Sequence, residues 1–324
     1  MIQDRRYRLL LPLWAGALFL FLLMAGRSRL CTELFLSGIL VLGRKVLPSV
    51  FPYLVLGGIL SKTGALSFFG GKRAERLTRL FFLPGSCLPA LLAGLFSGFP
   101  LGAAVTSEIY LQGRCTKGQA ERLSALCNFC GPPFLLGAFG QGVLGDVRLG
   151  FLFFLVQTVI VLLYGILQGL WAKKRGEDQT ILPPKGAFAE KKQVSPLLQV
   201  GRCIAEGALQ TVRIGGYVLF FLMVSGVLCR TLFSFFAEYP LFEALLCGFF
   251  EFSSGVSAIG SGGATGLLFG GMIVCFSGLS VHMQVAGFLN DAGLSAKKHL
   301  RCHLFLCPVV PAAALLLARV MGLL

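Results

Sequence analysis

The sequence has 324 residues, of which 56% are hydrophobic and 13% are charged, and its mean hydropathy is +0.80. Soluble proteins average roughly 45–50% apolar and about 25% charged residues. This composition therefore indicates an integral membrane protein, and it excludes a soluble enzyme, a secreted disulfide scaffold and a disordered chain. The net charge of +15 comes from short basic clusters between apolar runs, which argues against a nucleic-acid partner. The lipid bilayer is the first partner that the composition predicts.

The chain opens with a basic segment followed by the apolar run 9–26. Because no small-residue cleavage site precedes Arg27, we interpret residues 1–30 as a retained N-terminal membrane helix. The stretches 31–44 and 197–213 place their polar residues at helical intervals and predict helices lying at the membrane interface. Further apolar runs that could enter or cross a bilayer lie at 46–61, 80–105, 148–171, 214–236, 240–252, 264–290 and 303–323.

The hydrophilic segment 173–196 separates two halves, 31–172 and 197–324. Its excess of Lys and Arg predicts a cytoplasmic linker under the positive-inside rule. Three segments of the first half resemble segments of the second half in the same order: 46–60 and 214–228, 90–98 and 244–252, 127–133 and 274–280. We therefore predict an all-α polytopic membrane protein built from two repeats with interrupted or re-entrant helices. Such repeats hold a substrate near the membrane midplane, where broken helices turn backbone groups toward a cavity.

Two breaks interrupt the apolar runs of the first half. The first break contains Ser97, Gly98 and Pro100, which supply a hydroxyl, a flexible backbone and a missing N–H. A half-helix that starts near Leu101 would point its positive end at this break. The second break follows Asn128, whose amide offers a donor and an acceptor to a ligand. Both breaks also have a structural explanation. The small residues of the first break permit close helix packing, and Asn128 at the second break could satisfy backbone groups freed by the turn.

The second half places one carboxylate, Glu251, within apolar sequence and directly before Ser253 and Ser254. An ionisable residue at such depth is a functional candidate, either for proton coupling or for hydrogen bonding to a substrate. The alternative is a helix cap or an ion pair at the surface. The last break lies between Ser277 and Ser280, and both hydroxyls are further candidates for the binding site.

His282 and Gln284 follow the last break in an otherwise apolar run, and we include both among the candidates for substrate binding or coupling. A lone histidine is more often structural, and that alternative stays open for His282. His299 and His303 have helical i,i+4 spacing, but no carboxylate accompanies them. The sequence therefore predicts no metal site there.

Eleven cysteines are present, and they predict no disulfide framework. Cys127 and Cys130 form a CxxC pair that lacks the βαβ context of a redox motif. Cys229 and Cys247 lie inside apolar segments, where cysteine behaves as a small hydrophobic residue. We expect no cofactor.

Four motifs carry a family resemblance: GLFSGFPLGA at 94–103, GRCTKGQAERLSALCNFCGPPFLLGAFG at 113–140, GFFEFSSG at 248–255 and FSGLSVHMQVA at 276–286. Together they resemble the sporulation integral membrane protein YlbJ family, a group of membrane proteins with nucleoside-recognition Gate domains. The resemblance implies a transporter-like protein of a bacterial cell membrane or a spore-related membrane. It also implies a distant similarity to concentrative nucleoside transporters and, through some members, a link to dipicolinic acid movement into the developing spore. The chain departs from the family at Phe99, where a Tyr is usual, and at the less polar Asn128-Phe129-Cys130.

We therefore expect a transporter or permease, and not an enzyme, for a small polar or anionic metabolite, with dipicolinic acid implied by the resemblance. Two repeats would move around a central site, half-helix ends would receive the polar part of the ligand, and Glu251 with His282 would carry a coupling proton. A nucleoside or nucleobase carrier is one alternative. A non-transporting Gate-type subunit that assembles with a membrane partner or as a homo-oligomer is another. A membrane enzyme would need a nucleophile elbow or a metal-ligand motif, and neither is present in the sequence.

Overall fold

The computed structural model describes residues 2–62, 72–177, 195–236, 238–260 and 262–324. These residues form helices joined by short turns and contain no β-strand, which confirms the predicted all-α class. By length and composition, four of the described helices can cross a membrane: Val147–Arg175, Leu197–Thr231, Gly263–Asp291 and Lys297–Val320. A fifth span results if Leu10–Gly26 and Ser28–Arg44, which meet at 96°, form one bent span. The protein is thus polytopic, as predicted, while most of the linker 173–196 lies outside the described residues.

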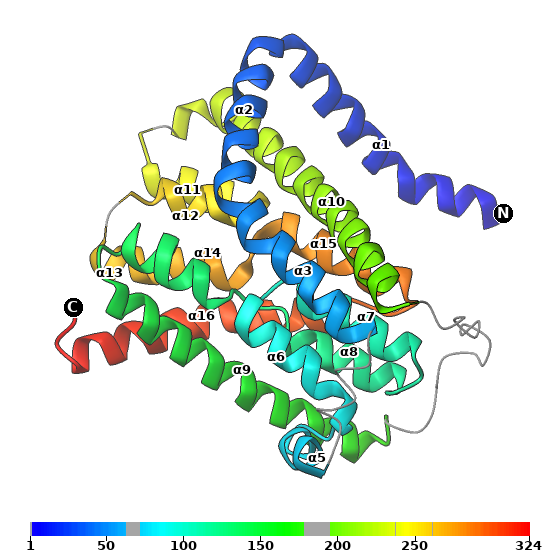
Figure 1. Cartoon of the computed structure of the whole chain (residues 1–324). Coiled ribbons are helices and arrows are strands. Elements are labelled where there is room, and N and C mark those ends of the chain that lie inside the picture. The colour runs from blue at the N-terminus through cyan, green and yellow to red at the C-terminus, as the bar shows by residue number, and fades with distance from the viewer. Residues whose placement is uncertain (1, 63–71, 178–194, 237, 261) are drawn as a thin grey trace.

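Figure 1 shows the described helices coloured in chain order. After α1 (Ile2–Gly26), the first half contains α2 (Ser28–Val41), η1 (Leu42–Val46), α3 (Leu47–Lys62), α5 (Lys72–Arg79), η2 (Gly85–Cys87), α6 (Leu88–Ser97), α7 (Leu101–Leu111), α8 (Lys117–Leu126), η3 (Pro133–Gln141) and α9 (Val147–Arg175). The second half contains α10 (Pro196–Thr231), η4 (Ser234–Phe236), α11 (Pro240–Phe250), α12 (Phe252–Ala258), α13 (Gly263–Thr265), η5 (Gly266–Gly270), α14 (Gly271–Phe276), α15 (Gly278–Asp291) and α16 (Lys297–Val320). Helices are interrupted in each half, and the division into two repeats stays a prediction.

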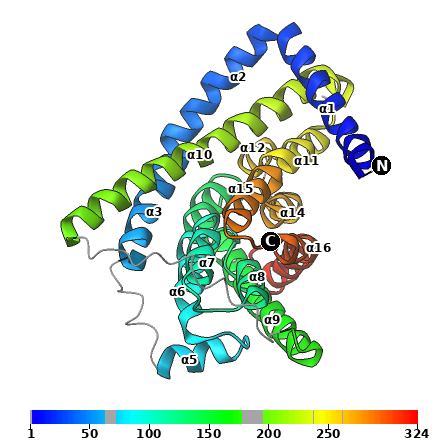
Figure 2. The same ribbon diagram turned by 90° about the vertical axis from the view of Figure 1, so that its right-hand side faces the viewer.

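Two long helices pack antiparallel beside the rest of the molecule (Figure 2). One is the continuous helix formed by α2, η1 and α3, and the other is α10; we call this pair the arms. Glycines permit their close approach, because a Cβ on Gly38 would lie 2.6 Å from Leu219 Cδ2 and a Cβ on Gly226 would lie 2.6 Å from Leu34 Cδ2. Each half of the chain contributes one arm.

Helices of both halves contribute to one large hydrophobic core. Hydrogen bonds also join the halves directly. Ser107 Oγ of α7 donates to Phe288 O of α15 at 2.9 Å, and Ser295 N donates to Glu121 Oε1 of α8 at 3.0 Å. The helix breaks of the two halves are therefore held in a common framework.

Candidate functional site

Residues from the breaks at 97–100, 130–133 and 251–253 line a cavity of about 590 Å³. Cavities that bind small molecules typically measure about 300–1,000 Å³. The arms contribute Val41, Ile214 and Val218 to its wall. The predicted site residues that line it are Ser97, Pro100, Glu251, Ser253 and Gln284. The predicted site residues outside this lining are Gly98, Asn128, Ser254, Ser277, Ser280 and His282.

The two breaks of the first half lie backbone to backbone. Gly98 follows α6 with a φ of +74°, and a Cβ at this position would overlap Phe129 O and lie 2.7 Å from Gly131 N. Phe99 N–H donates to Phe129 O at 3.2 Å. Gly98 therefore permits close packing, which is the structural alternative for this break, while the neighbouring Ser97 faces the cavity.

Asn128 is fully buried, and its side chain holds other parts of the chain together. Its Oδ1 accepts a hydrogen bond from Ala103 N in the first turn of α7 at 2.8 Å, and its Nδ2 donates to Ser124 O at 2.7 Å. The N-terminal end of α7, which the sequence predicts to be free for a ligand, is thus capped by the side-chain amide of Asn128. A ligand would have to displace Asn128 to reach the Ala103 N–H.

Glu251 joins α11 to α12 in an extended conformation, with φ −140° and ψ 112°, and it lines the cavity. The residue is 1% exposed, so it does not lie at the surface. Its Oε2 accepts hydrogen bonds from Ser253 Oγ at 2.7 Å and from Ser254 N at 2.8 Å. Glu251 is therefore the N-cap of α12 and a cavity residue at once, with two donors holding its carboxyl group.

The second-half breaks also pack closely and position one amide at the cavity. Ser277 has a φ of +70°, and a Cβ on the adjacent Gly278 would lie 2.9 Å from a backbone oxygen of α11. Gln284 is buried on α15, and its Nε2 donates to Ser280 Oγ at 3.1 Å. Ser280 thus acts indirectly, by holding the Gln284 side chain that lines the cavity.

Three phenylalanines from both halves form an aromatic side of the cavity: Phe99, Phe134 and Phe252. The ring centroid of Phe252 lies 5.2 Å from that of Phe99 in an edge-to-face arrangement and 4.8 Å from that of Phe134. Such rings pack favourably against a flat aromatic ligand. The sequence does not single out Phe134 or Phe252, because nothing local separates them from the other phenylalanines among the 30 in the chain.

All three histidines of the chain meet in the core, outside the cavity lining. His282 Nδ1 lies 3.2 Å from His299 Nε2. His303 Nε2 lies 2.7 Å from Asn128 O, and its Nδ1 lies 2.6 Å from Cys275 O. A neutral imidazole has one N–H, so both of these contacts are hydrogen bonds when the ring carries a second proton. With both ring nitrogens facing carbonyl oxygens, His303 links the breaks of the two halves and is not placed to bind a metal ion.

Comparison with known proteins supports the resemblance indicated by the four sequence motifs. The chain is 25% identical over 310 residues to the sporulation integral membrane protein YlbJ of Bacillus subtilis (strain 168), which covers 86% of this chain and 76% of that protein. No family model and no solved structure match the chain. The similarity extends over most of both proteins and confirms the resemblance predicted from the sequence. The chain is therefore an integral membrane protein whose sequence is similar to that of YlbJ.

Proposed function

We propose that this protein transports a small, flat metabolite that carries a carboxylate group, together with a proton. The observation that supports this most is the cavity between the breaks, where the Glu251 carboxyl group lies with three phenylalanine rings. Transporters with interrupted helices bind their substrates at such junctions. The name of the B. subtilis relative connects that protein with sporulation. Dipicolinic acid, an aromatic ring with carboxyl groups, is our lead candidate through the family resemblance.

The charge of the cavity is the reason for including a proton. Its described lining contains Glu251 but no Lys or Arg. Two carboxylates that approach each other away from bulk water repel strongly unless one of them is protonated. Binding of a carboxylate ligand would therefore accompany proton uptake, either on Glu251 or on the ligand. This linkage would couple substrate movement to a proton gradient.

We propose transport and not catalysis. Ser253 Oγ donates to Glu251 Oε2 at 2.7 Å, but none of the three histidines lines the cavity. Ser253 therefore lacks the imidazole base that commonly activates a serine nucleophile.

Uptake of labelled dipicolinate into proteoliposomes tests the proposal, with an inward proton gradient imposed or omitted. The wild type should show saturable uptake that the gradient stimulates. Glu251→Gln keeps the hydrogen-bonding shape but cannot exchange a proton, so its uptake should fall by about tenfold, or ~1.4 kcal/mol, and lose its dependence on the gradient. Glu108→Gln is the matched control, because Glu108 bonds to Gln112 near the far end of α7 and does not line the cavity.

Other outcomes distinguish the alternatives. Gradient-dependent uptake by Glu251→Gln equal to that of the wild type would contradict the proton role. Competition by nucleosides or nucleobases, but not by aromatic carboxylates, would favour a nucleoside carrier in which Gln284 reads a base edge. No uptake by folded protein, together with a stoichiometric membrane partner after purification, would favour the non-transporting Gate-type subunit.

A further inference from the structure

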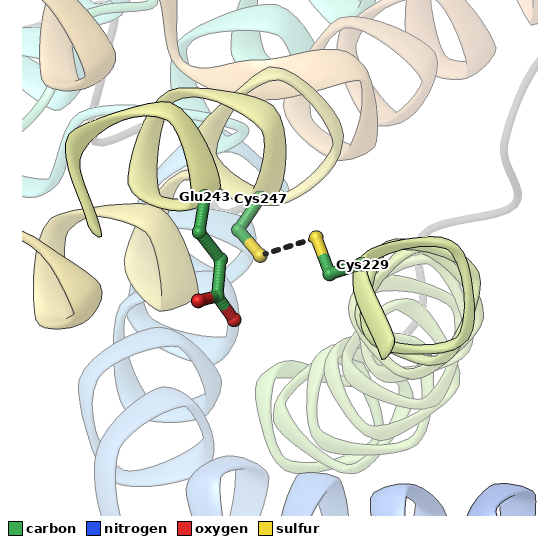
Figure 3. A group of neighbouring side chains, drawn as sticks. All are labelled: Cys229, Glu243 and Cys247. Carbon is green, nitrogen blue, oxygen red and sulfur yellow. Dashed lines mark hydrogen bonds between the residues drawn. The ribbon is translucent and has the colours of Figure 1, made fainter. Parts of the chain in front are cut away.

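Three side chains able to bind a metal ion converge where the end of α10 meets α11 (Figure 3). Cys229 lies in the last turn of α10, and Glu243 and Cys247 lie on one face of α11 with i,i+4 spacing. The two Sγ atoms are 3.4 Å apart. Together with a carboxylate oxygen of Glu243, they lie within 4.8 Å of one another. The two cysteines thus face each other across a helix junction, which their apolar sequence context does not indicate.

We propose that Cys229, Glu243 and Cys247 bind a zinc ion. With Zn–S bonds of about 2.3 Å, a tetrahedral zinc ion holds two sulfur atoms roughly 3.8 Å apart. The observed 3.4 Å is close to this separation, whereas a disulfide requires about 2.05 Å. Two thiolates with one carboxylate suit zinc, while magnesium and calcium prefer ligand sets made of oxygen atoms.

Access and coordination number agree with this assignment. Cys229 is buried, whereas Cys247 and Glu243 are partly exposed, so an ion can enter from one side of the junction. Three protein ligands leave the fourth tetrahedral position to water. Binding requires both thiols to lose their protons, so zinc affinity should rise with pH.

The zinc site would fasten the end of one arm to α11, the helix that ends immediately before Glu251. Cys247 O accepts a hydrogen bond from Glu251 N at 2.7 Å, so the site lies one helical turn from the cavity residue. A bound ion would hold α11 against α10 and thereby limit movement of the Glu251 backbone. The assignment does not depend on what the cavity transports.

Metal binding by the full-length protein in detergent tests the proposal. Protein purified with reductant and chelator, then freed of both, is titrated with Zn²⁺ against a chromophoric chelator and separately with Co²⁺. The wild type should bind one zinc per chain and give a near-ultraviolet thiolate-to-cobalt band. Cys229→Ser and Cys247→Ser should each lose stoichiometric binding, and Glu243→Gln should keep the cobalt band with an affinity about tenfold lower. Cys31→Ser, which changes a cysteine in α2, is the matched control and should bind as the wild type does.

Several results would contradict the proposed zinc site. Wild-type protein that binds no stoichiometric zinc would overturn it, as would serine variants of Cys229 and Cys247 that retain full binding. A Cys229–Cys247 disulfide found in protein alkylated at the moment of cell lysis would also overturn it. If the serine variants do not fold, the wild type and Glu243→Gln decide the question, because the absence of a thiolate-to-cobalt band in both excludes the site.

Discussion

At the scale of single residues, glycines determine how closely the helix breaks approach one another. A Cβ on Gly102 would overlap Cys127 O and lie 2.6 Å from Cys127 C. Gly102→Ala should therefore lower the free energy of unfolding by about 1–3 kcal/mol, because α7 would have to move away from the second break. In α10, a Cβ on Gly216 would meet no neighbouring atom within 4 Å, so Gly216→Ala should be neutral or stabilising by up to about 1 kcal/mol. Thermal unfolding of both variants in detergent measures the difference, and equal midpoints would contradict it.

His303 connects the two halves through backbone carbonyl groups. His303→Phe would remove the ring nitrogens that lie 2.7 Å from Asn128 O and 2.6 Å from Cys275 O, and with them the N–H that a neutral imidazole donates to one of these oxygens. We expect a loss of about 1–3 kcal/mol in the free energy of unfolding for the buried acceptor that this change leaves unpaired. His303→Gln restores N–H donors on a side chain of similar length, so it should lose less. Denaturant unfolding of the two variants tests this order, and a Phe variant as stable as the wild type would contradict it.

Residue type and position predicted part of the candidate site. Glu251 could be recognised because a carboxylate within apolar sequence is rare, and the structure places it at the cavity. The contact of His282 with His299 depends on how α15 packs against α16, and no periodicity within either helix shows it. Phe252 could not be recognised for the same reason, since its cavity position depends on Phe99 and Phe134 from the other half.

At the scale of secondary-structure elements, Asp146 caps the first turn of α9. Its Oδ1 accepts from Arg148 N at 2.8 Å, and its carboxylate pairs with the Arg148 guanidinium at 2.8 Å. The Arg148 side chain, and then its backbone N–H, hold the pKa of Asp146 below its usual range. The pKa of Asp146 is therefore lower in the folded protein than in the unfolded chain, where it is near 3.8. The cap stabilises the protein fully at pH values above this unfolded pKa, and the stabilisation is lost as the pH falls through the folded pKa.

Asp146→Asn should separate the charge of this cap from its geometry. The amide oxygen can still accept from the Arg148 N–H, but it does not titrate. The unfolding midpoint of the variant should therefore depend less steeply on pH than that of the wild type between about pH 5 and pH 2. Because the pair is exposed, the difference should be small and weaker at high salt. Parallel curves for the two proteins at low salt would contradict the role of the charge.

Helix interruptions were more predictable than helix continuity. The breaks at Gly98–Pro100, Glu251 and Ser277 occur where Gly, Pro and Ser cluster in the sequence, because these residues weaken or end helices. The stretches 31–44 and 197–213, expected as helices at the membrane interface, are helical and continue without a break into the helices that follow, so they form the first parts of the arms. A π-helical turn at Leu42–Val46 carries the first arm past Gly43 without a break, and such a local adjustment has no clear sequence signal.

At the scale of the whole molecule, the packing of the arms can be tested by a cross-link. A Cβ on Gly58 of α3 would lie 3.6 Å from Cys203 Cβ and 3.7 Å from Cys203 Sγ, within the usual Cβ–Cβ range of about 3.5–4.5 Å for a disulfide. Gly58→Cys should therefore form a disulfide with Cys203 under mild oxidation. With a protease site introduced into the 173–196 segment, the cleaved variant should run as one band on a denaturing gel and as two after reduction.

The control for the cross-link is Gly58→Cys combined with Cys203→Ser, which should give two bands under both conditions. Two bands from oxidised Gly58→Cys would contradict the antiparallel packing of the arms. The predicted repeats do not by themselves determine this arrangement, because sequence similarity between halves does not show which helix of one half packs on which helix of the other.

The length of the second arm makes bilayer thickness a variable for this protein. α10 contains 36 residues and is therefore roughly 54 Å long, whereas the hydrocarbon core of a bilayer is about 30 Å thick. The arm must tilt strongly or extend into the headgroup region, and the first arm packed along it shares this orientation. A thicker membrane would bring both arms closer to the membrane normal and turn Val41, Ile214 and Val218 relative to the cavity. We therefore expect lipid chain length to influence the shape of the cavity.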